Sequence, residues 1–235
     1  MNLVLENVAK SFGDKKVLKN ITFSFEEGKI YGLLGRNGAG KTTLFNCLNE
    51  DLDLDGGVFY FSSNGEKKNV EANDIGYVLS TPVVPEFLTG REFLKFFIDI
   101  NKDHITDLKS IDEYFDLVKI DKDDRDKLMK DYSHGMKNKL QMLVHIIASP
   151  RLLLLDEPLT SFDVVVAEEM KELLKKIKKD HILIFSTHIM ELALDLCDEI
   201  VVLNGGILEH IENKDLSNKE LKDKIIKVLT GEEDV

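Results

Sequence analysis

The chain has 235 residues, of which 43% are hydrophobic and 31% charged, and its formal net charge is −12. This composition is typical of a folded globular protein, and the acidic balance argues against a nucleic-acid partner, because such proteins gain much of their affinity from basic side chains on phosphates. No apolar run approaches the roughly 20 residues of a membrane-spanning helix, and the N-terminus lacks a basic start and a cleavable apolar stretch, so we expect neither a span nor a signal peptide.

The first part of the chain predicts several strands, the first two of which are joined by a turn that contains a glycine. Apolar and polar residues alternate in two early segments, which predicts a small antiparallel sheet with a turn at Gly13. A continuous apolar run follows, and Gly35 ends it. The expected strands cover residues 3–8, 17–25, 29–34, 57–62 and 74–78, and a helix is expected over 42–48.

The pattern changes at about residue 90. Apolar residues such as Phe93, Leu94 and Phe97 recur at helical spacing, which predicts an inserted helical lobe over about 90–149. Strands and helices then alternate, as in a mainly parallel sheet covered by helices. The expected strands are 152–155, 182–186 and 199–203, the expected helices are 164–177 and 190–196, and the polar tail from about 213 to 235 has an amphipathic stretch at 221–229. The predicted fold class is therefore α/β.

A phosphate-binding loop is predicted between the apolar strand and the first helix. Gly35–Thr42 has the spacing G-x-x-x-x-G-K-[ST], in which glycines let backbone N–H groups face phosphate oxygens. Lys41 can then reach the β- and γ-phosphates, and the Thr42 hydroxyl can hold Mg²⁺. A glycine-rich turn with an incidental lysine is the alternative, which the flanking strand and helix oppose. The expected nucleotide-binding residues are Gly35, Arg36, Asn37, Gly38, Ala39, Gly40, Lys41, Thr42 and Thr43.

Two carboxylates follow the apolar strand 152–155. At the carboxyl edge of a parallel sheet, Asp156 would lie beside the phosphate-binding loop and hold Mg²⁺, while Glu157 would orient or deprotonate the attacking water. A strand followed by an acidic helix cap has the same appearance. The phosphate-binding loop in the same chain favours a nucleoside triphosphatase.

These motifs, in this order, resemble the ATP-binding subunits of ABC transporters over nearly the whole chain. The segment 132–136, Tyr-Ser-His-Gly-Met, is similar to the family signature Leu-Ser-Gly-Gly-Gln and keeps its serine and second glycine, while His134 and Met136 depart from it. The resemblance implies that Ser133 and Gly135 contact the γ-phosphate held by a second cassette, at a helix N-terminus that suits an anion.

The resemblance also assigns roles to single residues. Asp163 matches the aspartate of the D-loop, and His188 matches the switch histidine near the γ-phosphate, although an ordinary strand-end histidine would look the same. Phe12 fits the aromatic residue that stacks on adenine, and it equally fits a core position. Ser80 stands where the family has a glutamine or glutamate that touches Mg²⁺ and links to the membrane partner. Because serine is too short to span that distance directly, Ser80 would reach Mg²⁺ through a bridging water, or Glu86 would substitute for it.

The resemblance implies a single ATP-binding domain over 1–235, built on a P-loop NTPase core with an N-terminal antiparallel β lobe. Such a chain would hydrolyse ATP with Mg²⁺ as a pair of cassettes. It would drive a separate membrane-spanning subunit and lie in the cytoplasm, on the inner face of the membrane. Segments 88–94 and 132–137 resemble cassettes of two-component exporters of the bacitracin- and lantibiotic-resistance type.

Two alternatives stay open. A soluble regulatory ATPase would generally carry two cassettes or long coiled-coil insertions, which this sequence lacks. A non-catalytic ATP-binding module is favoured by Ser80 and opposed by Glu157 and His188.

Overall fold

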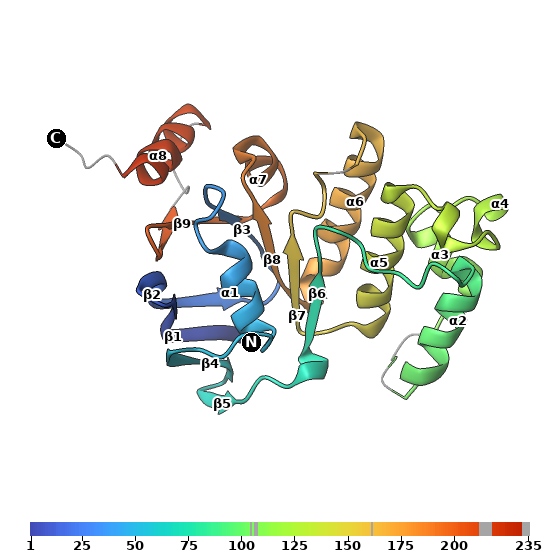
Figure 1. The fold of residues 1–235 in the computed structure, drawn as a ribbon, viewed down its shortest axis with the longest axis horizontal. Coiled ribbons are helices and arrows are strands. Elements are labelled where there is room, and N and C mark those ends of the chain that lie inside the picture. Colours follow the sequence, from blue (N-terminus) through green and yellow to red (C-terminus); the bar gives the residue numbers. More distant parts are fainter. Residues whose placement is uncertain (104, 106–107, 161, 212–217, 232–235) are drawn as a thin grey trace.

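The computed structural model describes residues 1–103, 105, 108–160, 162–211 and 218–231, and it places two sheets among the helices (Figure 1). The N-terminal sheet has the strand order β2-β1-β4-β5, with every pair antiparallel. Its strands are β1 (Asn2–Phe12), β2 (Lys15–Glu26), β4 (Gly56–Ser63) and β5 (Glu66–Lys68). The predicted antiparallel pair is confirmed, and the sheet is wider than predicted because β4 pairs with the other edge of β1.

The second sheet has the order β10-β9-β3-β8-β7-β6 and is parallel except for β10, which runs antiparallel to β9. Its strands are β3 (Ile30–Leu34), β6 (Ile75–Val78), β7 (Leu152–Asp156), β8 (Ile182–Thr187), β9 (Glu199–Asn204) and β10 (Ile207–Ile211). Every residue of β3, β7 and β8 is buried, as expected for parallel strands covered on both faces. The α/β fold class with a mainly parallel sheet is confirmed.

The helices surround this second sheet. Helix α1 follows β3 and lies on the side of the N-terminal sheet, whereas α2 to α5 lie between β6 and β7 in the chain and gather at the opposite end of the molecule (Figure 1). The helices are α1 (Lys41–Leu48), α2 (Gly90–Asn101), α3 (Ile111–Leu117), α4 (Lys122–Arg125), α5 (His134–Ala148), α6 (Val164–Ile177), α7 (Met190–Leu196) and α8 (Asn218–Thr230), with short 3₁₀ turns at Ala72–Asp74, Met129–Asp131 and Lys178–Asp180. Within the described ranges, each helix is too short or too polar to cross a bilayer.

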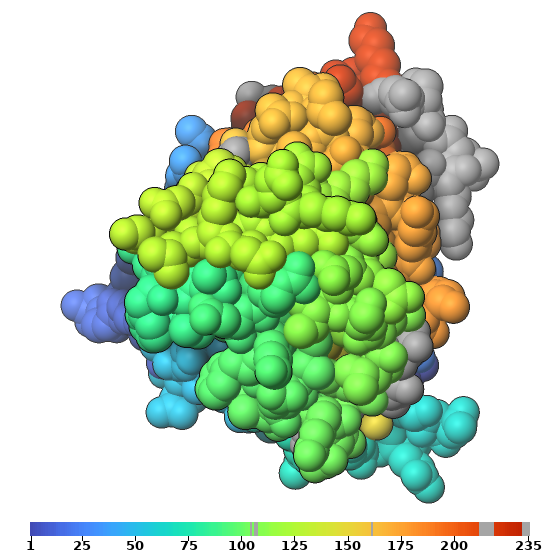
Figure 2. All heavy atoms as spheres, turned by 90° about the vertical axis from the view of Figure 1, so that its right-hand side faces the viewer, coloured from blue at the N-terminus to red at the C-terminus, as the bar shows by residue number. Residues whose placement is uncertain are grey.

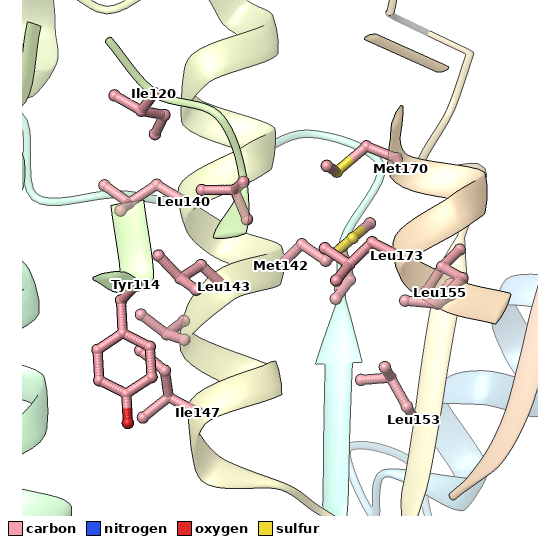
Figure 3. Packing of buried hydrophobic residues seen from close by; sticks show 14 of the residues in the cluster. Tyr114, Ile120, Leu140, Met142, Leu143, Ile147, Leu153, Leu155, Met170 and Leu173 are labelled. Atoms are coloured by element: carbon pink, nitrogen blue, oxygen red, sulfur yellow. The ribbon is translucent and has the colours of Figure 1, made fainter. Parts of the chain in front are cut away.

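Helix α5 connects the helical lobe to the sheet through a shared core. On one side its residues face Tyr114 and Ile120 of the lobe, and on the other Met142 lies near Leu173 of α6 (Figure 3). The strand residues Leu153 and Leu155 continue the same cluster (Figure 3). Because protein interiors are densely packed, this shared core joins α5 to the helical lobe on one side and to β7 and α6 on the other.

Candidate nucleotide-binding site

The loop between β3 and α1 depends on glycine at several positions. Gly38 has φ +80° and Gly40 has φ +111°, in the region that glycine adopts at least cost. Gly35 is required for a different reason, because an added Cβ would lie 2.8 Å from the Leu203 carbonyl oxygen of β9. The predicted spacing therefore corresponds to a curled loop pressed against the sheet.

A pocket of about 430 Å³ opens beside this loop. Its volume falls within the range of small-molecule sites. Phe12 is half exposed at this pocket, with Lys10 Nζ 5.7 Å from its ring centroid, so Phe12 is not a core residue. The lining combines an aromatic ring with polar and basic groups from both sheets: Phe12, Lys15, Val17, Asn37, Gly38, Gly40, Lys41, Thr42, Thr43 and Glu157.

Lys41 is a buried cation at this pocket. Its Nζ donates to the Gly35 carbonyl at 2.8 Å and lies 3.9 Å from the nearest Glu157 oxygen. Burial lowers the pKa of Lys41, while the negative charges of Glu157 and Asp156 act in the opposite direction. A phosphate anion would offset the lost solvation of the ammonium group.

Asp156 accepts two hydroxyl hydrogen bonds at the end of β7. Thr42 Oγ1 donates to its Oδ2 at 2.9 Å, and Ser186 Oγ donates to its Oδ1 at 2.5 Å. The Thr42 hydroxyl and the Asp156 carboxylate are hard oxygen donors of the kind that bind Mg²⁺ together with substrate phosphates and waters. The described residues contain no cluster of three or more His, Cys, Asp or Glu side chains that would form an all-protein metal cage. The donor set therefore fits Mg²⁺ shared with a nucleotide.

Glu157 leaves the strand in a left-handed conformation, with φ +49°. Such a conformation in a non-glycine residue costs about 1–3 kcal/mol and often marks a functional site. Hydrogen bonds hold it there, because the Glu157 N–H donates to the Ser186 carbonyl at 3.2 Å and Thr160 Oγ1 donates to the Glu157 carbonyl at 2.9 Å. The turn brings Glu157 Oε1 within 3.0 Å of His188 Nδ1.

Ser133, Gly135 and Asp163 lie outside the pocket lining. Ser133 Oγ caps α5 by accepting from the Met136 N–H at 3.1 Å, and Asp163 caps α6 by accepting from the Val166 N–H at 3.0 Å. An added Cβ at Gly135 would lie 3.5 Å from the ring of Phe162, so these two helix starts adjoin. The site residues predicted from the sequence thus form separate groups within one chain. One group lies around the pocket, and Ser133, Gly135 and Asp163 form another at the starts of α5 and α6.

Ser80 also lies outside the pocket lining, exposed just after β6. The carboxylate of Glu86, considered as its substitute, pairs with Lys137 at 2.6 Å. Sequence reasoning missed Ser186, for which the available signal was a small polar residue closing an apolar strand.

Comparison with known proteins places these features in a family. Residues 18–160, more than half of the chain, match the ABC transporter family. The chain belongs to this family. As an ABC ATPase, it is 35% identical over 210 residues to an uncharacterised ABC transporter ATP-binding protein of Methanocaldococcus jannaschii, with 88% of this chain and 75% of the relative covered.

A second relative of this ABC ATPase is the bacitracin transport ATP-binding protein BcrA of Enterococcus faecalis, 31% identical over 223 residues, which cover 92% of this chain and 71% of BcrA. Import ATP-binding proteins match as well, so family membership does not separate export from import. A solved dimeric ATP-binding cassette in a post-hydrolysis state, bound to ADP and phosphate, has a TM-score of 0.74 at 20% identity, with 90% of this chain and 99% of that chain covered. This likeness confirms the cassette fold.

Proposed function

We propose that this ABC cassette binds and hydrolyses ATP in the pocket beside the Gly35–Gly40 loop and powers a separate membrane-spanning subunit, as part of an exporter. The observation that carries the proposal is the meeting of Glu157 and His188, just beyond β7 and β8, with Lys41 at the start of α1. Glu157 Oε1 lies 3.9 Å from the ammonium group and 3.0 Å from the imidazole. In open α/β sheets, ligands bind just outside the carboxyl ends of the parallel strands.

Each side chain at this edge has a proposed role. The Phe12 ring stacks on the adenine base, and Lys41 with the loop backbone binds the phosphates. Thr42 and Asp156 hold Mg²⁺, which when bound supplies charge neutralisation at the phosphates. Glu157 orients or deprotonates the attacking water, and His188 holds the Glu157 carboxylate and contacts the γ-phosphate.

We propose that a second cassette completes the site. Ser133 and Gly135 lie at the N-terminus of α5, where free N–H groups and the helix dipole favour an anion, yet they do not line their own chain's pocket. A head-to-tail pair, of two copies or of this chain and a similar one, would place them and Asp163 against the partner's nucleotide. The dimeric cassette with the same fold is consistent with this arrangement.

The proposed contact with the membrane-spanning subunit is the face formed by α2 and the segment before it (Figure 2). Apolar side chains are exposed here, at 72% for Val83, 79% for Phe87 and 57% for Phe96. Exposed apolar groups that gather in one region are typical of an interaction surface. Through this partner the chain would lie on the inner face of the cell membrane. The resemblance of segments 88–94 and 132–137 to cassettes of two-component exporters supports export as the direction.

The Glu157→Gln variant tests the proposed hydrolysis. We expect turnover to fall by at least about 10²-fold, because the carboxylate base is lost, while ATP and Mg²⁺ hold the variant as a stable dimer. Steady-state phosphate release and sedimentation with and without ATP measure the two effects. Glu172→Gln, at an exposed position on α6, is the matched control. Turnover equal to that of the wild type in Glu157→Gln would remove Glu157 from this role.

The membrane partner needs its own test. If a membrane-spanning protein is encoded beside this chain, expression of the two together should give a complex that co-purifies and shows faster ATP hydrolysis than the isolated chain. A chain that never associates with a membrane protein, and whose hydrolysis no membrane protein stimulates, would favour the soluble regulatory ATPase.

A further inference from the structure

The segment that follows Ser80 is joined to the segment that leads into Ser133. Thr89 and Leu128 form an antiparallel β-bridge. Next to it, on the side of Glu86, the Met129 N–H donates to the Leu88 carbonyl at 2.8 Å and the Lys130 N–H donates to the Glu86 carbonyl at 3.1 Å. Because backbone pairing fixes register, residues 86–90 and 128–133 form one unit.

An ion pair extends this unit onto α5. Lys137 Nζ lies 2.6 Å from Glu86 Oε1, and Lys137 is one helical turn beyond Ser133, to whose carbonyl its N–H donates at 3.0 Å. The Lys137 side chain is mostly buried, at 17% exposure, so its position is set by packing as well as by charge. The pair connects residues 86–90 to the first turn of the helix that carries Ser133 and Gly135.

A tight contact is present at the other end of the unit. Tyr132 is buried, and an added Cβ on Gly90, the first residue of α2, would lie 2.1 Å from its hydroxyl oxygen. Among the described residues, the hydroxyl has no hydrogen-bond partner. A buried hydroxyl without a partner is unfavourable for folding, so stability alone does not account for tyrosine here. The phenol instead fills the space next to Gly90 and leaves no room for a side chain at the start of α2.

We propose that Glu86, Lys137 and Tyr132 are positioning residues that lock segment 86–90 to the start of α5, so that Ser133 and Gly135 move together with this segment. The inference rests on the proposed function, in which Ser133 and Gly135 contact the nucleotide of a second cassette. Segment 86–90 includes Phe87, which belongs to the proposed face for the membrane-spanning subunit. A displacement of that face is thereby transmitted to the signature residues through a short, defined set of contacts.

The ion pair is tested by charge reversal in the Glu157→Gln background. ATP-driven dimerisation of the full chain is measured by sedimentation for Glu86→Gln, for Lys137→Met and for the double variant Glu86→Lys/Lys137→Glu. We expect each single change to weaken dimerisation about three- to tenfold, and the reversed pair to restore it to within about twofold. Urea unfolding midpoints should change little, because the Glu86 side chain is 63% exposed and ion pairs with a solvent-exposed partner contribute little to stability.

A matched control comes from an ion pair remote from this unit. Lys222 Nζ lies 3.2 Å from Glu191 Oε1, so Lys222→Met removes a comparable contact between α7 and α8 and should leave dimerisation unchanged. Single variants at Glu86 and Lys137 that dimerise like the Glu157→Gln parent would overturn the inference, as would a reversed pair no better than the single variants. If the Glu157→Gln parent forms no ATP-dependent dimer, the proposed function itself is wrong.

The steric contact provides a second, independent test. Gly90→Ala should weaken dimerisation in the same assay, because the new methyl group collides with Tyr132, and Tyr132→Leu should weaken it as well, because the phenol that contacts the start of α2 is lost. Circular dichroism checks that both variants are folded. Equal dimerisation of Gly90→Ala and its parent would contradict a rigid contact between Tyr132 and α2.

Discussion

His188 Nδ1 lies 3.0 Å from Glu157 Oε1 although 31 positions separate the two residues. The contact follows from the parallel pairing of β7 and β8, in which Asp156 is opposite Ser186, so that residues just beyond each strand meet at one edge. It also requires the left-handed turn at Glu157. The imidazole therefore restricts where the carboxylate can point.

Replacing His188 by alanine should slow hydrolysis with little effect on ATP binding. Without the imidazole, Glu157 loses the partner that orients it, and we expect kcat to fall about 10²-fold while KM changes less than about threefold. His210→Ala is the control, because His210 makes a similar contact with Glu199 at 3.0 Å in β10 and β9. A His188→Ala enzyme with the kcat of the wild type would show that the contact does not serve catalysis.

Ser186→Ala should destabilise the fold. The Ser186 hydroxyl is fully buried, donates to Asp156 at 2.5 Å and accepts from the Glu157 N–H at 3.2 Å. Its removal leaves a buried carboxylate oxygen without this donor, which costs about 1–3 kcal/mol in the free energy of unfolding. Urea denaturation measures the loss. Ser24→Ala, at an exposed position on β2, should change the free energy of unfolding by less than about 0.5 kcal/mol, and equal values for the two variants would contradict the prediction.

The sequence was sufficient to predict the phosphate-binding loop and the strand end at Asp156, because both depend on local rules. The loop is set by glycine spacing between a strand and a helix, and the carboxylate is placed by a short apolar run. The backbone angle of Glu157 was not predictable, since no glycine or turn signature marks that position. Its conformation is fixed by the hydrogen bond that its N–H donates to β8 and by the one that its carbonyl accepts from Thr160.

Pairing between distant segments was harder to predict than the segments themselves. Residues 57–62 were expected to form a strand, but its place beside β1 depends on long-range register. Strand β10 was missed because it has only five residues, which are mostly exposed, and because its position in the sheet is set by pairing with β9. Glu86 was considered as a substitute for Ser80 because the two residues are close in the sequence. In the structure its carboxylate pairs with Lys137, which lies 51 positions away on α5.

Two glycines of the loop should respond differently to alanine. At Gly38 nothing lies within 4 Å of an added Cβ and the penalty is the positive φ alone, so Gly38→Ala should cost about 1 kcal/mol in the free energy of unfolding. At Gly35 the methyl group would meet a backbone carbonyl at 2.8 Å, which cannot move without shifting β9. We expect Gly35→Ala to lose more stability and also to lose binding of a fluorescent ATP analogue. Urea denaturation compares the free energies of unfolding of the two variants, and titration with the fluorescent analogue compares their binding. A Gly35→Ala variant more stable than Gly38→Ala would contradict the prediction.

Acidification should destabilise the protein through His145 on α5. Burial lowers the pKa of His145 from 6.5 to about 4, and a hydrogen bond with the Tyr77 backbone opposes the shift only in part. Between these two values the unfolded chain binds more protons than the folded one. The stabilisation is therefore complete above pH 6.5 and is lost as the pH falls toward 4. At about 1.4 kcal/mol per pKa unit, this single group accounts for a loss of roughly 3 kcal/mol.

The His145→Gln variant isolates this contribution. Other groups that titrate in acid are shared with the wild type, so the difference between the two proteins reports on His145 alone. We expect the free energy of unfolding of the wild type to approach that of the variant as the pH is lowered from 7 to 4, in urea titrations at half-unit steps. Parallel curves for the two proteins over this range would mean that His145 binds its proton equally in the folded and unfolded chains. Its packed position, with Nδ1 3.1 Å from an added Cβ at Gly76, argues against that.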